Sequence, residues 1–164
     1  MSLANNYFLP NKSVNWEDHT FMPQNDGEIA PLVVLVGKDE ETRFLLKTFL
    51  DVWKCRAGEA TNETDLIKIA GGEKPNLILM DVSLAFEEDL TCLRRMRALN
   101  AFKNTPIIVV SGHARACNSA LALAAGADEY MIKPIDFDRL ENPVKRYPFN
   151  NRRAATEMNF GGLA

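Results

Sequence analysis

The hydrophobic pattern of the chain consists of short, uniformly apolar runs separated by stretches in which apolar residues recur at helical spacing. Uniform runs lie at residues 32–36, 77–80 and 107–110, and a shorter run lies at residues 129–132. Runs of this kind are typical of strands that are buried on both faces of a parallel sheet. A weaker alternation at residues 52–56 predicts one more short strand, near a sheet edge.

The stretches between these runs predict amphipathic helices at about residues 40–50, 63–70, 87–99 and 114–125. Asp39 is placed to act as the N-cap of the first helix. The buried face of this helix is expected to contain Leu45, Leu46, Phe49 and Leu50. Because strands and helices alternate, we expect an α/β fold, with a parallel sheet, right-handed crossovers and helices on both sides.

The predicted helix at residues 87–99 has an apolar side and a basic side. Leu90, Leu93 and Met96 recur on one face, which predicts that this face is buried. The basic residues near its end are Arg94, Arg95 and Arg97. We interpret these arginines as a solvated face and not as a phosphate-binding site.

The ends of the chain differ in character from its middle. Residues 1–30 are polar, rich in Asn and Pro and carry scattered aromatic side chains, so we interpret them as an N-terminal arm. Residues 31–142 are expected to form a single domain and residues 143–164 a C-terminal tail. A last helix should start near Asp136, and Pro143 and Pro148 predict that it is short or broken.

The composition is that of an ordinary globular protein, with 46% hydrophobic residues and a formal net charge of −3. This charge favours neither nucleic acid nor a membrane surface as a partner. Cys55, Cys92 and Cys117 are odd in number and widely spaced, which is typical of reduced thiols. The sequence carries neither a run long enough to span a bilayer nor a signal peptide pattern, and we therefore expect a cytoplasmic location.

Three of the expected strands end in polar residues of complementary chemistry, namely Asp81, Ser111 and Lys133. Ligands of open α/β sheets bind outside the carboxyl ends of the strands, so these side chains are candidates for one site. A carboxylate can act as a nucleophile towards phosphorus, while a hydroxyl and an ammonium can hold the phosphoryl oxygens. The three residues together indicate phosphoryl transfer.

At these residues the sequence resembles the receiver domain of bacterial two-component response regulators, over roughly residues 32–142. The resemblance implies a flavodoxin-like (βα)5 sandwich with a five-stranded parallel sheet in the order 2-1-3-4-5. It implies that Asp81 is the phosphoacceptor for a histidine kinase or phosphotransfer protein, and that Lys133 and Ser111 are catalytic. It also implies a conformational switch formed by Ser111 and Tyr130, and a cis bond between Lys133 and Pro134.

The expected metal site departs from the pattern of the resembling family. In that family two acids after the first strand hold a divalent metal, and here Gly37 and Lys38 occupy their positions. Asp39 falls where a glutamate is common. An alternative register would slide Asp39 and Glu40 into the place of the pair, but it needs two extra residues at the end of the strand. We favour the register without a gap.

The remaining oxygen ligands predict little affinity for a metal. The candidate ligands are Asp81, Ser83 and Asp39, and we expect at most weak Mg²⁺ binding and no other cofactor. A typical site of three carboxylates and one lysine carries a charge of about −2, which a divalent ion offsets. Lys38 and Lys133 largely cancel that charge here. Lys38 either pairs with Asp81 or extends into water, and Lys38→Asp, more so together with Gly37→Asp, is expected to improve Mg²⁺ binding.

Two classes of function follow. In the first, the chain is a stand-alone receiver in a phosphorelay, not an enzyme, that passes its signal to a downstream protein partner. In the second, it is a pseudo-receiver that is not phosphorylated and binds other proteins. A flavodoxin-fold metabolic enzyme is a distant third class because the sequence lacks a glycine-rich phosphate loop.

Overall fold

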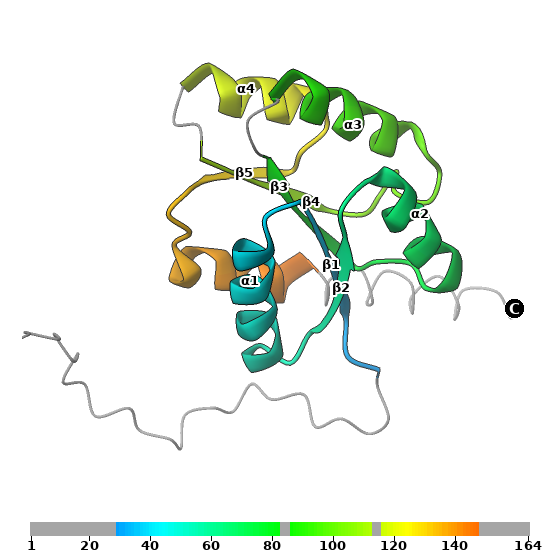
Figure 1. Ribbon diagram of the computed structural model, residues 1–164, viewed down its shortest axis with the longest axis vertical. Helices are drawn as coiled ribbons and strands as arrows, with labels where there is room; N and C mark the ends of the chain where they lie inside the picture. The colour runs from blue at the N-terminus through cyan, green and yellow to red at the C-terminus, as the bar shows by residue number, and fades with distance from the viewer. Residues whose placement is uncertain (1–28, 83–85, 113–115, 148–164) are drawn as a thin grey trace, which may run out of the picture.

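The computed structural model describes residues 29–82, 86–112 and 116–147 (Figure 1). Its centre is a five-stranded parallel sheet in the order β2-β1-β3-β4-β5. The strands are β1 (Leu32–Val36), β2 (Arg56–Ala60), β3 (Leu77–Val82), β4 (Ile107–Ser111) and β5 (Glu129–Ile132). This sheet confirms the expected α/β fold and its strand order.

Helices cover both faces of the sheet, as the sequence predicts. They are α1 (Glu40–Val52), α2 (Glu63–Gly72), α3 (Phe86–Ala98), α4 (Ala116–Ala125) and a helix at residues 137–147, here called the C-terminal helix. One face is covered by α1 and the C-terminal helix, and the other by α2, α3 and α4 (Figure 1). In the described part of the chain, each helix is too short or too polar to cross a membrane.

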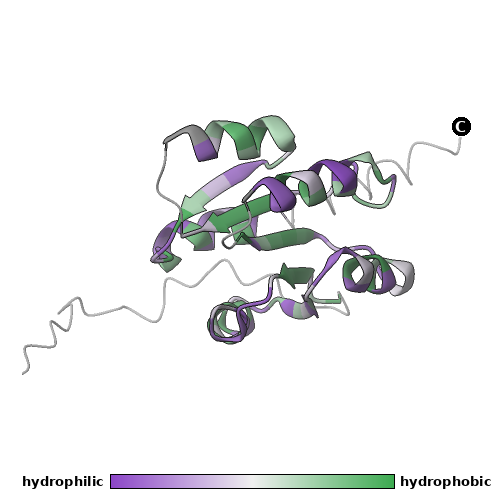
Figure 2. Cartoon of the chain, turned by 45° about the horizontal axis from the view of Figure 1, so that its top comes forward, coloured by the Kyte–Doolittle hydropathy of each residue, from purple (hydrophilic) through white to green (hydrophobic). Residues whose placement is uncertain are grey.

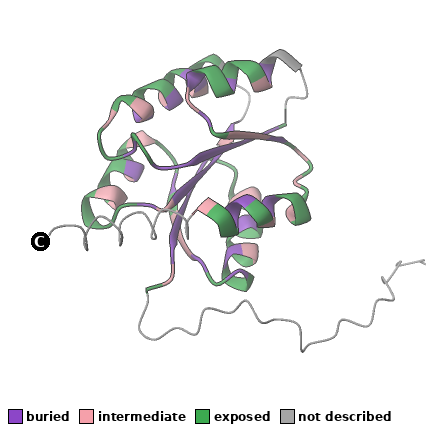
Figure 3. Ribbon diagram, turned by 180° about the vertical axis from the view of Figure 1, so that it is seen from behind, coloured by how far each residue is buried: buried purple, intermediate pink, exposed green. Residues whose placement is uncertain are grey.

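The alternation of side chains along β1 divides the core into two clusters. Val33 and Leu35 face the α1 side, while Val34 and Val36 face the α2–α4 side. All the residues of β1 are buried, and the central strands β1, β3 and β4 form a hydrophobic and buried layer between the helices (Figures 2 and 3). The uniformly apolar sequence of this strand is explained by burial on both of its faces.

The edge strand β2 lies later in the chain than predicted. Residue 52 ends α1, Trp53 caps it, and Lys54 turns the chain with a φ of 60°. The strand begins at Arg56, which pairs with Leu32 of β1. Only Ala60 of β2 is buried, so the strand lacks an apolar pattern and is defined by backbone pairing with β1.

The buried face of α1 is narrower than expected. Leu46 and Leu50 are buried, and the partly buried Phe49 stacks on Phe137 of the C-terminal helix with ring centroids 3.7 Å apart. Leu45 is 43% exposed, so its assignment to this face is wrong. It lies about 100° around the helix from Leu46, because an α-helix has 3.6 residues per turn.

The C-terminal helix does not break at Pro143 but continues to residue 147. Pro143 lacks an N–H for the helical ladder, which carries an energetic penalty. Leu140 and Val144 are fully buried in the core on the α1 side, and this burial offsets the penalty. The Tyr147 hydroxyl donates to Glu129 Oε1 at 2.9 Å and fixes the end of the helix to β5. Pro148 and most of the predicted arm and tail lie outside the described residues.

Candidate functional site

The carboxyl ends of β3 and β5 bring Asp81 and Lys133 into direct contact. Asp81 is the penultimate residue of β3, and its side chain is 4% exposed. The Lys133 ammonium lies 2.9 Å from Asp81 Oδ1 and donates a hydrogen bond to Oδ2 at 3.0 Å. Lys133 follows β5 directly, and its bond to Pro134 is cis, as the resemblance implies. The structure thus pairs these two residues, as expected for a site at this edge of the sheet.

The first turn of α1 supplies the remaining contacts of Lys133. Its ammonium donates to Thr42 Oγ1 at 3.1 Å and lies 3.8 Å from Asp39 Oδ2. Asp39 is the N-cap of α1, as predicted, and accepts hydrogen bonds from the Thr42 hydroxyl and from the Glu41 N–H. The Thr42 hydroxyl, then the Glu41 N–H and the Lys133 charge, lower the pKa of Asp39 below its usual range.

Gly37 fixes the register of the loop that joins β1 to α1. A Cβ atom at Gly37 would lie 2.8 Å from Asp81 Cβ, so only a residue without a side chain fits beside the carboxylate. The Gly37 N–H donates to Ala60 O at 3.0 Å, and its own carbonyl accepts from Arg43 Nη1 at 2.6 Å. These contacts match the register without a gap, in which Gly37 and Lys38 stand in place of the acid pair.

Lys38 is exposed, and within the described part of the chain it forms no ion pair with Asp81. Of the two expectations for this side chain, the extension into water is therefore the one observed. The ammonium beside Asp81 comes from Lys133 instead.

The residues present do not fit a divalent metal. A hard divalent cation requires several oxygen ligands. Among the described residues, no group of three or more His, Cys, Asp or Glu side chains is arranged to hold a metal ion. The Lys133 ammonium already contacts Asp81 and lies near Asp39, two of the three predicted ligands. The third, Ser83, lies outside the described residues.

The two predicted switch residues lie on the neighbouring strands. Ser111 is fully buried at the end of β4, where it pairs in register with Val82, the residue after Asp81. Tyr130 of β5 is partly buried and packs against the core on the α2–α4 side. The strand ends therefore place Ser111 close to Asp81 in the sheet, while Tyr130 lies further from the carboxyl edge.

Thr42 is a site residue that the sequence reasoning missed. It occupies the third position of α1, three residues after the N-cap Asp39. At this position a polar side chain can reach back to the N-cap, as in a capping box. That spacing was a usable signal, but the contact with Lys133 depends on how α1 packs near β5 and is not visible in the sequence.

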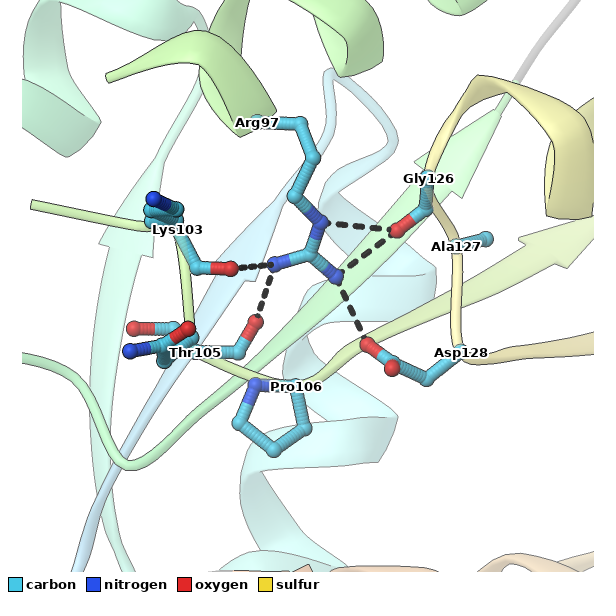
Figure 4. A pocket seen from close by; sticks show the side chains of 8 residues that line it. Arg97, Lys103, Thr105, Pro106, Gly126, Ala127 and Asp128 are labelled. Atoms are coloured by element: carbon cyan, nitrogen blue, oxygen red, sulfur yellow. Dashed lines mark hydrogen bonds and ion pairs between the residues drawn. The ribbon is translucent and has the colours of Figure 1, made fainter. Parts of the chain in front are cut away.

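A second cation, Arg97, and its acceptors lie at the opposite end of the strands, where β4 and β5 begin (Figure 4). Arg97 of α3 donates from Nε and Nη2 to the Gly126 carbonyl oxygen at 2.9 and 2.7 Å. Its Nη1 donates to the carbonyl oxygens of Phe102 and Thr105 at 2.8 and 2.6 Å. Its Nη2 also donates to Asp128 Oδ2 at 2.7 Å, so each guanidinium nitrogen has a partner.

The assignment of Arg97 to a solvated face is therefore wrong. Arg94 and Arg95 are exposed as expected, but Arg97 joins the end of α3 to the segments that enter β4 and β5. Its donors are occupied by carbonyl oxygens and one carboxylate, which indicates a structural role.

Comparison with known proteins identifies the family of this chain. The family profile described as the response regulator receiver domain matches residues 33–145. The chain belongs to the response regulator receiver domain family. Members of this family are signalling modules and in general not enzymes, and they commonly bind Mg²⁺ in the active site. The chain is accordingly a receiver domain of two-component signalling.

The curated relatives are longer proteins. The transcriptional regulatory protein ZraR of Salmonella typhimurium is 27% identical over 126 residues, which cover 77% of this chain and 28% of ZraR. The Regulator of RpoS of Escherichia coli is 30% identical over 142 residues, which cover 79% of this chain and 41% of that protein. The chain thus spans less than half the length of these relatives.

Solved structures show the same fold. A response regulator from Thermotoga maritima is 28% identical and superposes with a TM-score of 0.64. The superposition covers 73% of this chain and 98% of that one. The receiver domain of the sensor histidine kinase PA1611 from Pseudomonas aeruginosa, solved with a magnesium ion in its active-site cleft, has a TM-score of 0.61. It is 20% identical and covers 73% of this chain and 98% of its own, so this likeness shows the fold alone.

The comparisons also bear on the remaining expectations. They do not favour the pseudo-receiver alternative. Because the relatives include transcriptional regulatory proteins, they give no support to the expectation that nucleic acid is not a partner.

Proposed function

We propose that Asp81 accepts a phosphoryl group from the phosphohistidine of a histidine kinase or phosphotransfer protein. One observation carries this proposal: Asp81 is buried at a strand end, and both of its carboxylate oxygens lie within 3.0 Å of the Lys133 ammonium. A carboxylate placed at a strand end in this way can act as the nucleophile towards phosphorus. As the new O–P bond forms, the P–N bond of the donor breaks and its electron pair returns to the imidazole nitrogen.

Lys133 and Ser111 are assigned supporting roles in this step. The Lys133 ammonium lies within 3.0 Å of both Asp81 oxygens and can balance the charge of the incoming phosphoryl oxygens. Ser111, buried at the adjacent strand end, supplies a hydroxyl for the phosphoryl group. Movement of Ser111 towards that group would shift Tyr130 and change the surface presented to a downstream partner, provided the phosphoryl group binds the two states with different affinity.

The resident oxygen ligands support only weak Mg²⁺ binding. The magnesium ion in the PA1611 receiver shows that the fold can hold the metal in its active-site cleft. In this chain Gly37 and Lys38 provide no side-chain oxygen at the positions of the acid pair. The expected cytoplasmic location and the identity of the downstream partner remain predictions.

Incubation of the full chain with acetyl phosphate, read by intact mass, tests the proposed acceptor. We expect a mass gain of one phosphoryl group in the wild-type protein and none in Asp81→Asn, which keeps the shape of the side chain. As a matched control, Asp51→Asn alters an exposed aspartate of α1 and should leave the mass gain unchanged. Equal mass gain in Asp81→Asn and the wild-type protein would show that another residue is the acceptor.

A further inference from the structure

We propose that phosphoryl acceptance at Asp81 does not require Mg²⁺, because Gly37 and Lys38 replace the acid pair and the Lys133 ammonium, held by Thr42 and Asp39, is the cation that faces the carboxylate. This inference rests on the proposed function of Asp81 and extends it to the conditions under which the site works. It starts from the mismatch between the residues of the site and the metal that the family commonly binds.

The position of the ammonium is the first argument. Lys133 Nζ contacts Asp81 on β3 and lies 3.8 Å from Asp39 on α1, so a single cation lies between two carboxylates from different elements. The nearby loop offers no further side-chain oxygen, since Gly37 has no side chain and Lys38 is a cation.

The charge of the site is the second argument. The formal charges of Asp81, Asp39 and Lys133 leave one negative charge, and the exposed Lys38 in the same loop brings the formal total of the site and its loop to zero. A typical receiver of three carboxylates and one lysine reaches the same neutral total only when a divalent ion is bound. This chain therefore reaches with its own side chains the charge balance that a metal otherwise supplies.

Thr42 is the third argument, because it fixes the direction of the ammonium. A lysine ammonium has three N–H donors. Here they are directed at the Asp81 carboxylate and at the Thr42 hydroxyl, which in turn donates to Asp39. Thr42 is thus a positioning residue that acts on the reacting carboxylate through Lys133.

The reaction balances without a metal. With acetyl phosphate, an Asp81 oxygen forms the new O–P bond while the P–O bond to acetate breaks, and acetate leaves with the electron pair. Acetate is a stable anion and needs neither a proton nor a metal to leave. The site gains one negative charge, which Lys133 is placed to stabilise as it develops.

The test compares phosphorylation of the full chain by acetyl phosphate in excess EDTA and in excess Mg²⁺, with intact mass as the readout. We expect equal initial rates in the two buffers. Phosphorylation that occurs only with Mg²⁺ would overturn the inference and leave the proposed function intact. A wild-type chain that gains no phosphate in either buffer would overturn both, so the two failures are distinguishable.

Thr42 variants test the positioning role in the EDTA buffer. Thr42→Val removes the hydroxyl at nearly constant volume, and we expect its rate to fall by about tenfold or more, as for a displaced catalytic group. Thr42→Ser keeps the hydroxyl and should retain most of the wild-type rate. Far-ultraviolet circular dichroism confirms that both variants are folded. Equal rates for the valine variant and the wild-type chain, or loss of rate in the serine variant as well, would contradict this role.

Discussion

Two cations lie at opposite ends of the strands of the same sheet, and the groups that they contact differ in chemistry. Arg97 lies where β4 and β5 begin and donates mainly to backbone carbonyl oxygens (Figure 4). Lys133 lies where β5 ends and faces the carboxylate of Asp81, with a second carboxylate, Asp39, close by. Neutral carbonyl oxygens are not nucleophiles, and the one carboxylate that Arg97 contacts, Asp128, is exposed, whereas the carboxylate of Asp81 is buried and can act as a nucleophile. The comparison shows how partner type separates a structural cation from a functional one.

The largest expected effect is that of removing the structural cation. Arg97→Met leaves the carbonyl oxygens of Gly126, Phe102 and Thr105 without this donor, and we expect a loss of about 3 kcal/mol in unfolding free energy. Urea unfolding measures this loss. Arg94→Met, at an exposed position of the same helix, is the control and should change the stability by less than about 0.5 kcal/mol. A similar small change for Arg97→Met would remove the distinction between the two ends of the sheet.

The turn that packs against Arg97 should show the next largest effect. Gly126 has a φ of +116°, and a Cβ there would lie 2.8 Å from Arg97 Cγ. We expect Gly126→Ala to lower the unfolding free energy by about 2 kcal/mol, through backbone strain and contact with Arg97. Gly71→Ala is the matched control, because a Cβ at this α2 position meets nothing within 4 Å. That control should leave the stability unchanged or raise it.

Substitutions at the end of the sheet that carries Asp81 and Lys133 should change ligand binding more than they change the unfolding free energy. Lys38→Asp places a carboxylate on an exposed residue near Asp81, so we expect tighter Mg²⁺ binding and a stability change within about 0.5 kcal/mol. Mg²⁺ titration followed by amide NMR shifts of Gly37 and Thr42 measures the affinity. Identical Mg²⁺ affinity in the variant and the wild-type chain would show that Lys38 does not limit metal binding.

The structure revises the companion substitution Gly37→Asp. The sequence alone predicts that it improves Mg²⁺ binding further, but its Cβ would lie 2.8 Å from Asp81 Cβ. We now expect Lys38→Asp alone to bind Mg²⁺ better than the double variant, because the added side chain displaces Asp81 or the loop.

The smallest expected effect is a pH dependence at this same end of the sheet. The Thr42 hydroxyl holds the pKa of Asp39 below its usual range, so this contact stabilises the fold above the ordinary aspartate pKa, about 3.9, and is lost as the pH falls through the lowered value. We therefore expect the pKa of Asp39 to rise in Thr42→Val and to stay low in Thr42→Ser. Carboxyl carbon NMR shifts measure both values. An unshifted pKa in the valine variant would assign the lowering to other groups.

The sequence predicted most clearly the strands that are buried on both faces, β1, β3 and β4. The partly buried β5 was also predicted, and the nearness of Asp81 and Lys133 follows from strands that end in polar residues. These predictions succeed because a strand that is buried on both faces is uniformly apolar and is easily recognised in the sequence. The site follows because parallel strands bring their carboxyl ends together.

The misses share a different physical cause. β2 is defined by pairing with its neighbour and not by hydrophobicity, and the C-terminal helix continues through Pro143 because of tertiary packing. The hydrogen bond of Arg97 to the Gly126 carbonyl oxygen and the contact of Thr42 with Lys133 join residues that are 29 and 91 positions apart in the chain. Such contacts depend on the relative placement of elements, which a local pattern does not encode.

The close approach of Gly37 to Asp81 has a consequence for how this site can change under mutation. With an acid at position 37 the loop would have to stand further from β3, and with glycine the backbone has settled beside the carboxylate. An acid introduced at this position would require the loop to move first, so a single substitution would pass through a strained intermediate. The order of substitutions therefore matters, because an acid at position 37 fits only after other changes have moved the loop away from Asp81.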